Sequence, residues 1–369
     1  MKYYIIAGEA SGDLHGSNLI KAIHKQDKNA VVRCWGGDLM QDAGGTLAKH
    51  YKELAFMGFL EVLKNIPTIF RNMSFCKRDI EDFNPDVLVF IDYSGFNLRI
   101  AKWAKKQGYS TNYYISPQVW ASRASRVEKI KRDVDKMHVI LPFEKDFYAT
   151  YGYDVNFVGH PLIDAIADRT QVDEVDFRKR HGLGTKKIIA LLPGSRQQEI
   201  VKMLSVMLSL VADFKEYQFV IAGAPSQEYA FYAQFMKTEN VCFIPNKTYD
   251  LLSISYAALV TSGTATLETA LFKVPQVVCY KGSEISYQIA KRIITLKFIS
   301  LVNLIMDKEV VTELIQSAFN KKQLTIELSK ILDRAHREQL FLAYYELEQK
   351  LGGKGASEKA AASIIEGLK

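Results

Sequence analysis

The chain of 369 residues is too long for one compact core, so two domains are the first expectation. Its composition, 48% hydrophobic and 24% charged, is that of an ordinary globular protein, and its net charge of +7 favours anionic partners such as nucleotides, phospholipid surfaces or nucleic acid. The four cysteines are scattered without C-x-x-C spacing, which argues against a disulfide framework or a zinc site and indicates a reducing compartment.

The first predicted strand, Lys2–Ala7, has no signal-peptide pattern before it, and no uncharged apolar stretch of membrane-spanning length occurs, so we expect a cytoplasmic protein. The strand runs into a small-residue turn at Gly8–Asp13, followed by a helix from Leu14 to about His24. The glycine spacing does not match a dinucleotide fingerprint. A functional turn and an ordinary glycine turn are equally good interpretations. The polar residues of the turn are Glu9, Ser11 and Asp13.

After a second strand at Ala30–Trp35, the segment Phe56–Phe75 carries apolar residues at helical spacing, with Pro67 expected to kink or split the helix. Lys64 and Arg71 lie among these apolar residues, so the segment could rest on an anionic membrane. A helix that packs on the core is the alternative, and periodicity alone favours it.

The run Asp86–Ile91 is apolar throughout, as expected for a strand buried on both faces of a parallel sheet. It ends at Asp92. Ligands of open α/β sheets bind at the carboxyl ends of strands, so Asp92 is the best-placed general base of the first half. The alternative is an aspartate that caps a turn or helix.

A strand at Thr111–Ile115 leads to Ser116, and the charged stretch Ala121–Lys136 follows. This stretch could meet a phosphate or a lipid head group, although a solvated helix face is the more ordinary interpretation. Further strands at Met137–Leu141 and Val155–Val158 end at His160, which is more often a structural residue than a ligand. The chain then turns polar over 162–187, where we place the domain junction.

The second half repeats the pattern. Two of its strands end in turns of the phosphate-binding type, Pro193–Arg196 and Ser262–Thr264, and the helix after the second turn carries Glu268. Parallel strands place both turns at one sheet edge. The predicted strands are Lys187–Leu192, Tyr217–Ala222, Val241–Ile244, Ala257–Thr261 and Gln276–Tyr280. The tail from about Leu324 is helical, with a break at Gly352–Gly355.

These turns and Asp92 suggest one chemistry. Arg196 can bind a diphosphate bidentately while the turn amides hold other oxygens. The sequence has no P-loop motif, so a diphosphate leaving group is favoured over a phosphoryl donor. An ionised Asp92 could take the proton of an attacking hydroxyl. The combination fits a metal-independent, inverting transfer from a sugar nucleotide.

The sequence also resembles the lipid-A-disaccharide synthases, glycosyltransferases of the two-Rossmann (GT-B) type. The similarity runs in the family's order from the N-terminus to about Gln316. The matching stretches are Ala7–Asp13, Met57–Leu63, Pro85–Asp86, Ile91–Asp92, Phe96–Asn97, Tyr114–Trp120, Leu141–Glu144, Val158–Pro161, Leu191–Arg196, Ser262–Glu268 and Asn303.

The resemblance implies an α/β protein with two Rossmann-like doubly wound domains facing a cleft and a helical C-terminal tail. An acceptor domain would span 1–165, joined by helices at about 340–369, and a UDP-sugar domain would span 166–339. UDP-2,3-diacylglucosamine would donate its sugar to the 6-hydroxyl of 2,3-diacylglucosamine 1-phosphate, giving a β-1,6-linked disaccharide 1-phosphate and UDP without a cofactor.

The resemblance also assigns residues, with Asp92 as the catalytic base. The UDP-sugar residues would be Gly194, Ser195, Arg196, Ser262, Gly263, Thr264, Ala265, Thr266, Glu268 and Asn303, and the acceptor cleft would hold Glu9, Ser11, Asp13 and Ser116. Contact with acyl chains or with the inner face of the cytoplasmic membrane would fall to Phe56, Met57, Phe59, Leu60, Leu63, Ile66, Ile69 and Phe70. No metal site and no nucleic-acid partner are expected, and a homodimer is a further expectation.

The chain departs from the family pattern at four places, one of which is Met306–Lys308, where the family often has Ala-Gly-Arg. A proline and a second acidic residue usually follow Asp92 where this chain has Ser94 and Gly95, and Val302 replaces a proline before Asn303. Ala121 stands where a second tryptophan is common. Two other hypotheses remain at this stage: a UDP-N-acetylglucosamine 2-epimerase, which shares the fold, and a basic nucleic-acid-binding protein, for which no motif is present.

Overall fold

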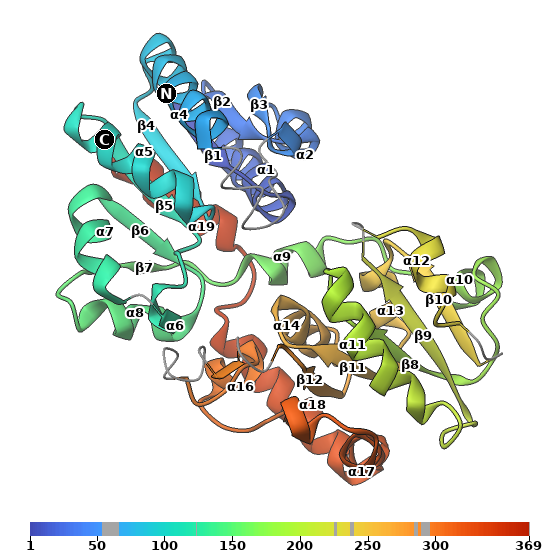
Figure 1. The fold of residues 1–369 in the computed structure, drawn as a ribbon. Helices are drawn as coiled ribbons and strands as arrows, with labels where there is room; N and C mark the ends of the chain where they lie inside the picture. The colour runs from blue at the N-terminus through green and yellow to red at the C-terminus, as the bar shows by residue number, and fades with distance from the viewer. Residues whose placement is uncertain are drawn as a thin grey trace. The chain divides into compact units, whose positions relative to one another are not determined.

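The computed structural model describes residues 1–53, 66–122, 124–224, 227–236, 240–283, 287–288 and 296–368. The chain forms two compact units, Met1–Asp164 with Leu351–Lys369 and Ala165–Lys350. Each unit has its own parallel sheet with helices packed on it (Figure 1).

The sheet of the first unit has the strand order β3-β2-β1-β4-β5-β6-β7. All its pairs are parallel. Its strands are β1 (Lys2–Ala7), β2 (Val31–Gly36), β3 (Thr46–His50), β4 (Val87–Ile91), β5 (Ser110–Tyr114), β6 (Lys136–Val139) and β7 (Asn156–Phe157). The helices are α1 (Ala10–Gln26), α2 (Asp38–Asp42), α4 (Ile66–Phe83), α5 (Ser94–Lys106), α6 (Val119–Ser122), α7 (Val127–Asp133), α8 (Pro142–Ala149) and α19 (Ala356–Glu366), with short 3-10 turns at Tyr51–Glu53 and Ala124–Arg126. Helix α9 (Pro161–Ala167) crosses the boundary between the units.

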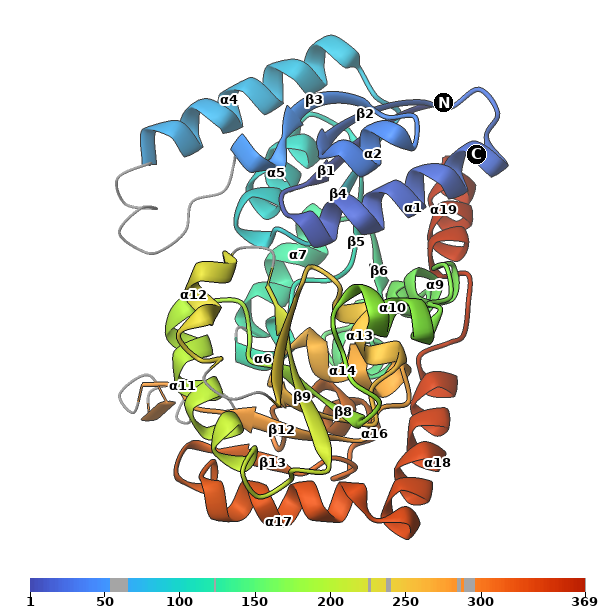
Figure 2. The same cartoon turned by 90° about the vertical axis from the view of Figure 1, so that its right-hand side faces the viewer.

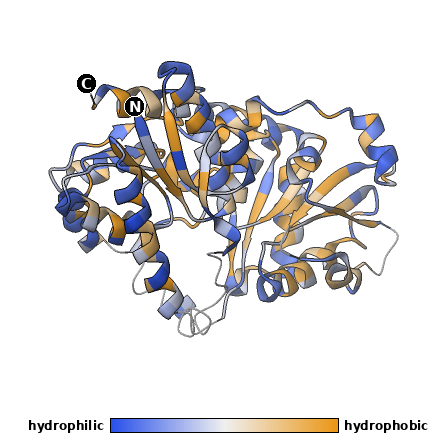
Figure 3. Ribbon diagram, turned by 90° about the horizontal axis from the view of Figure 1, so that it is seen from above, coloured by the Kyte–Doolittle hydropathy of each residue, from blue (hydrophilic) through white to orange (hydrophobic). Residues whose placement is uncertain are grey.

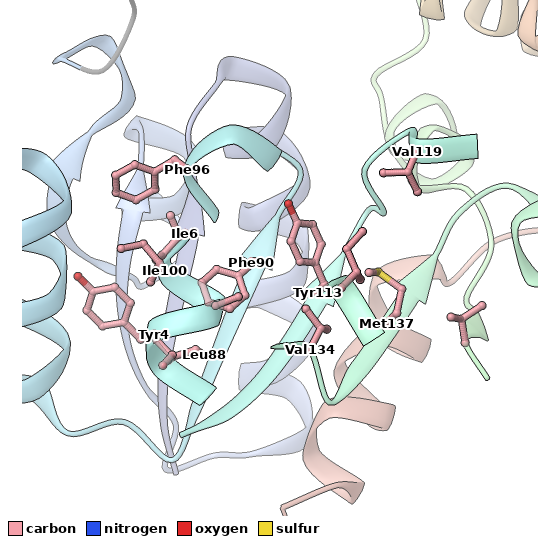
Figure 4. Close-up of a cluster of buried hydrophobic side chains, with 14 of the residues drawn as sticks. Tyr4, Ile6, Leu88, Phe90, Phe96, Ile100, Tyr113, Val119, Val134 and Met137 are labelled. Atoms are coloured by element: carbon pink, nitrogen blue, oxygen red, sulfur yellow. The ribbon is translucent and has the colours of Figure 1, made fainter. Parts of the chain in front are cut away.

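Alternate residues of the central strands enter two different apolar clusters, because successive side chains of a strand point to opposite faces of the sheet. Tyr4 and Ile6 belong to one cluster, whereas Tyr3 and Ile5 belong to the other. Figure 4 shows the first cluster, with Phe90 of β4 among its buried side chains. All five residues of β4 are buried, so this strand lies at the centre of the sheet and carries the segment that follows it, Asp92 and Tyr93. The largely apolar colour of the central strands is visible in Figure 3.

The C-terminal helix α19 returns to the first unit and packs against α1 (Figure 2). The Asp164 carboxylate fixes its start, since it accepts hydrogen bonds from the backbone N–H groups of Gly355 (2.7 Å) and Ala356 (2.9 Å). Gln26 Nε2 donates to the Glu358 carbonyl at 3.1 Å. Residues at the two ends of the chain therefore stabilise one unit.

The sheet of the second unit has the order β10-β9-β8-β11-β12-β13 and is also parallel. Its strands are β8 (Lys187–Leu192), β9 (Tyr217–Gly223), β10 (Val241–Pro245), β11 (Ala257–Thr261), β12 (Gln276–Tyr280) and β13 (Glu313–Ile315). The helices are α10 (Glu174–Arg180), α11 (Gln197–Met207), α12 (Tyr229–Ala233), α13 (Thr248–Ser253), α14 (Thr264–Leu271), α16 (Leu301–Met306), α17 (Lys321–Leu332) and α18 (Arg334–Lys350), with 3-10 turns at Leu208–Leu210 and Gln316–Ala318.

All predicted strands are confirmed, and four have the predicted bounds, β1, β8, β11 and β12. The edge strands β3 and β13 were not predicted. Helix α4 starts at Ile66, so Pro67 lies in its first turn, where the missing N–H has no intrahelical acceptor to lose. The prediction that Pro67 kinks or splits a helix over Phe56–Phe75 stays a prediction, because residues 54–65 lie outside the described residues.

Candidate active site

A pocket of about 300 Å³ lies in the second unit at the carboxyl ends of β8 and β11. Both predicted phosphate-type turns line it, the first through Gly194 and Ser195 and the second through Ser262, Gly263 and Thr264. Two strands that are neighbours in the sheet thus bring the turns together. Among the described residues, its lining is Leu192, Pro193, Gly194, Ser195, Glu199, Ala222, Ala224, Thr248, Thr261, Ser262, Gly263, Thr264, Ala265 and Glu268.

Glycine is required in both turns by backbone geometry. Gly194 has φ +101° and Gly263 has φ +155°, conformations that L side chains rarely adopt. The helix α14 begins directly after Gly263, and its first residues Thr264 and Ala265 line the pocket. A helix start leaves backbone N–H groups without intrahelical acceptors, so this end of the pocket attracts anions.

Side-chain hydroxyls hold the second turn in place. Ser262 Oγ donates to the Ile299 carbonyl at 2.8 Å, and Thr266 Oγ1 donates to the Gly263 carbonyl at 2.8 Å. Thr266 is buried and is not among the pocket-lining residues, so the structure places it as a support of the turn.

Glu268 lines the pocket one turn into α14 and accepts a hydrogen bond from the Tyr249 hydroxyl at 2.8 Å. Desolvation by the surrounding protein raises the pKa of Glu268, and the Tyr249 hydrogen bond opposes this rise. The pocket thus combines an anion-attracting end with a carboxylate acceptor, as a phosphorylated sugar or nucleotide requires.

Two further predicted UDP-sugar residues, Arg196 and Asn303, also lie outside the lining of the pocket. Arg196 is not a lining residue; its side chain is 83% exposed and lies 3.4 Å from Glu199 Oε1. Asn303 is fully buried, and both ends of its amide are already hydrogen-bonded: Oδ1 accepts from the Val310 and Val311 N–H groups, and Nδ2 donates to the Val311 carbonyl and to Glu313. In this structure Asn303 therefore supports the backbone behind the turn instead of facing the pocket.

The hydrogen bonds of Asn303 are linked to the second glycine turn through Glu313 and Ile299. Glu313 accepts from the N–H groups of Ile299 and Ser300, both at 2.9 Å, while the Ile299 carbonyl receives the Ser262 hydroxyl. Asn303 and Glu313 therefore fix the segment that fixes Ser262. Glu199 and Glu313 were not predicted as site residues, because carboxylates in a helix and a short edge strand carry no motif of their own.

Asp92 follows β4 with φ 42°, and Tyr93 follows with φ 46°. Two consecutive non-glycine residues in this region are uncommon and need support from their surroundings. The Asp92 carbonyl accepts hydrogen bonds from Asn97 Nδ2 (2.9 Å) and from the Tyr113 hydroxyl. Asp92 is exposed at the end of the strand, although enough protein surrounds its carboxyl to desolvate it in part.

The first glycine turn lies against this loop. A Cβ at Gly8 would lie 2.3 Å from the Tyr93 ring, so only glycine allows this approach. Glu9 and Ser11 are exposed. Desolvation raises the pKa of the Asp92 carboxyl, and the Glu9 carboxylate raises it further.

The other two acceptor-cleft candidates, Asp13 and Ser116, form hydrogen bonds inside this unit. The Asp13 carboxylate accepts from the N–H groups of Gly37 (2.7 Å), Met40 (3.0 Å) and Leu39 (3.2 Å), so it caps α2. Ser116 is buried and hydrogen-bonded to the Tyr148 hydroxyl at 2.7 Å. Asp13 lies in the charged turn that the sequence singled out, but its carboxylate has its partners inside the protein.

A buried carboxyl nearby was not predicted to be functional. Glu144 Oε2 accepts from the N–H groups of Leu141 (2.9 Å) and Ile140 (3.1 Å) at the start of α8. Burial raises the pKa of Glu144 to about 7, although these hydrogen bonds oppose the rise. Burial has the opposite effect on a histidine, since it lowers the pKa of His160 to about 3. The His160 Nδ1 accepts a hydrogen bond from the Leu162 N–H at 3.2 Å. His160 is thus a neutral structural residue.

The predicted membrane-contact residues are only partly described. Phe56, Met57, Phe59, Leu60 and Leu63, together with the Ile66 side chain, lie outside the described residues. On α4, Ile69 is half-buried and Phe70 is 61% exposed. No helix in the described ranges has the length and apolar character needed to span a membrane, and these ranges contain no cluster of three or more His, Cys, Asp or Glu suited to a metal ion.

Solved structures with this arrangement belong to one class of fold. A UDP-GlcNAc 2-epimerase from Neisseria meningitidis, solved bound to UDP-GlcNAc, aligns with a TM-score of 0.66 at 14% identity over 100% of this chain and 99% of its own. A glycosyltransferase from Rickettsia africae aligns with a TM-score of 0.58 at 12% identity, over 100% and 97%. The chain therefore has the two-Rossmann GT-B fold, with a pocket at the carboxyl ends of the strands of its second unit.

Sequence similarity is more specific. The family described as lipid-A-disaccharide synthetase matches residues 3–364. A lipid-A-disaccharide synthase from Syntrophus aciditrophicus is 39% identical over 98% of this chain and 96% of its own, and one from Coxiella burnetii is 35% identical over 99% and 97%. The chain belongs to the lipid-A-disaccharide synthase family, and it is a disaccharide-forming glycosyltransferase.

Proposed function

We propose that the protein transfers the sugar of UDP-2,3-diacylglucosamine to the 6-hydroxyl of 2,3-diacylglucosamine 1-phosphate. The observation that carries the proposal is the pocket of the second unit, where two glycine turns and Glu268 meet in a chain that matches the family from residue 3 to residue 364. The turn amides would hold the diphosphate, and Glu268 would accept hydrogen bonds from ribose hydroxyls. Arg196, exposed beside the first turn, has the freedom to move onto the diphosphate.

The reaction needs a base and a stabilised leaving group. The oxygen of the acceptor 6-hydroxyl forms a bond to the anomeric carbon as the bond from that carbon to the β-phosphate oxygen breaks. Asp92 takes the hydroxyl proton, and UDP leaves with the electron pair, held by the turn amides and Arg196. Attack opposite the leaving group inverts the anomeric centre and gives the β-1,6 linkage.

We also propose that the enzyme works at the inner face of the cytoplasmic membrane, where acylated substrates are held. The exposed Phe70 on α4 supports this location, since moving a large apolar side chain from water into a lipid surface lowers the free energy. A homodimer is compatible with the proposal and is not required by it.

Incubation of the purified protein with both acylated substrates tests the proposal directly. We expect one UDP released per disaccharide formed. Release of UDP without disaccharide, or epimerisation of UDP-N-acetylglucosamine, would contradict it.

The role of Asp92 is tested by Asp92→Asn. General-base catalysis contributes about 10²–10⁴-fold, so turnover should fall by that factor while UDP affinity stays unchanged. Asp154→Asn is the matched control, because Asp154 is an exposed aspartate of the same unit. Equal turnover in the two variants would remove Asp92 as the base.

A further inference from the structure

A second cavity, of about 330 Å³, lies in the first unit between α5 and α7, helices that pack side by side (Figure 1). We call it the cationic groove, because its charged lining consists of Arg99, Lys102, Arg126, Lys129, Arg132 and Asp133. Its polar end is formed by Ser94 and Gly95, which follow Asp92 by two and three residues. None of the roles given above to residues of this unit accounts for the groove.

The positive charge of the groove is largely uncompensated. The one lining carboxylate, Asp133, is bound bidentately by Arg132, at 2.7 Å from Nε and 2.6 Å from Nη2. The other four cations have no ion pair with any residue that the structure describes. Cations that share a concave surface without carboxylate partners repel one another, and a multivalent anion relieves that repulsion.

The chemistry of the lining favours a phosphate monoester. Guanidinium groups match phosphate oxygens in bidentate geometry, and lysines add point charges. The start of α5 lies at the same end through Ser94 and Gly95, and a helix start favours negative charge. A volume of about 330 Å³ exceeds the needs of a bare ion and reaches the range of small-molecule sites, so part of a sugar could enter with the phosphate.

We propose that the cationic groove binds the 1-phosphate of the acyl-sugar acceptor. This assignment rests on the proposed function, because it uses the acceptor named there. Two residue steps separate Asp92 from Ser94, a span of at most about 7 Å. In a hexose 1-phosphate, C1 carries the phosphate and C5 carries the primary hydroxymethyl group, and both carbons are bonded to the ring oxygen. A phosphate at the groove's Ser94 end therefore leaves the 6-hydroxyl within reach of the Asp92 loop.

A charge reversal at Lys102, compared with the same reversal at Lys106, tests the assignment. Both lysines are exposed on α5 one turn apart, but only Lys102 lines the groove. In neutral detergent micelles at physiological ionic strength, Lys102→Glu should raise the acceptor KM by about tenfold or more, because it replaces a lining cation by an anion and so changes the charge that faces the phosphate by two units. Lys106→Glu should change the acceptor KM less than about twofold, since Lys106 does not line the groove and an exposed charge interacts weakly through water. The KM for the UDP-sugar should stay the same in both.

A second pair of variants, at Gly95, removes no native side chain, and one member of the pair adds a charge. A Cβ at Gly95 meets nothing within 4 Å, so Gly95→Asp and Gly95→Asn should both fold. The aspartate should raise the acceptor KM several-fold above that of the asparagine variant. An acceptor analogue without the 1-phosphate should bind the wild type poorly, and Lys102→Glu should not weaken it further.

Equal effects at Lys102 and Lys106, or a full effect of Lys102→Glu on the analogue without phosphate, would overturn the assignment. So would a variant that loses only its binding to phosphatidylglycerol-containing vesicles, because the groove would then serve a membrane phospholipid. If the wild type forms no disaccharide, acceptor binding in micelles is compared between wild type and Lys102→Glu. A difference there would support the groove while the proposed transfer fails.

Discussion

The carboxyl of Asp92 has a pKa above its usual range, first because the protein desolvates it and second because Glu9 is close. A base must be ionised, so the acid limb of the rate profile should lie above the ordinary aspartate value of about 3.9. Glu9→Gln removes the second cause and should move that limb to lower pH, as measured by kcat/KM against pH. Glu53→Gln is the control. An unchanged limb would show that the titrating group is not Asp92.

The raised pKa of Asp92 also affects the stability of the folded protein. A carboxyl whose pKa is raised on folding adds stability below its unfolded pKa, and this is lost as pH rises through the folded pKa. Ionised Asp92 thus opposes folding at the pH where catalysis would need it. The consecutive positive φ angles of Asp92 and Tyr93 add backbone strain to this residue, which is the pattern expected where function, and not stability, selects a conformation.

Glu268 allows a ligand-based prediction at the same scale. If its carboxylate accepts from ribose, UDP should bind more tightly than 2′-deoxy-UDP or 3′-deoxy-UDP, and Glu268→Gln should reduce the larger of these differences by about tenfold or more. Glu199→Gln, which changes the other glutamate of the pocket, is the matched control. Calorimetric titration of each of the three proteins with each of the three nucleotides measures these affinities. A wild type indifferent to both hydroxyls would exclude the ribose contact.

At the scale of elements, the central strands could be predicted because they are continuous apolar runs. Strand β4 is buried along its whole length, and β8 and β11 have the same character. The strands that escaped prediction, β3 and β13, lie at sheet edges, where Thr46–His50 is only half-buried and Glu313 forms hydrogen bonds with its side chain. A half-buried edge does not impose an apolar pattern, so the sequence carries little signal there.

The candidate site also has features that the sequence could predict and features that it could not. Turns at strand ends could be predicted to meet, because parallel topology alone brings Gly194 and Gly263 to one edge. The sequence could not show whether a polar side chain near such a turn faces the ligand or the backbone. Asp13 and Asn303 satisfy backbone groups, and only tertiary contacts reveal this. The cationic groove was foreseen only as a charged helix, since its other wall comes from α5.

The Asp164 carboxylate holds the start of α19, so we expect its removal to weaken the packing of this helix. Asp164→Ala removes the acceptor of two backbone N–H groups at the start of α19 and should lower the free energy of unfolding by about 1–2 kcal/mol. Amide exchange should accelerate in α19 and in α1, which packs on it. Asp173→Ala, which removes the cap of α10 in the other unit, is the control. Equal protection of α19 in both variants would show that Asp164 does not hold it.

At the scale of the whole molecule, we expect both the net charge and the exposed apolar surface to contribute to membrane binding. The formal charge of +7 attracts the protein to anionic bilayers, and this attraction weakens with salt. The apolar contribution of α4 does not depend on salt, because it comes from area removed from water. Binding to vesicles at low and high salt therefore separates charge from insertion.

Phe70→Ser should reduce vesicle binding about threefold or more at both salt concentrations, since the phenyl group is worth about 1.5–3 kcal/mol when fully buried and part of that when inserted at a surface. Leu342→Ser is the matched control, because Leu342 is 72% exposed but lies on α18 of the second unit, whereas Phe70 is 61% exposed on α4. Co-sedimentation with phosphatidylcholine vesicles, with and without phosphatidylglycerol, measures both variants. If the two substitutions act equally, exposed apolar area in general is responsible, and α4 is not the membrane-facing element.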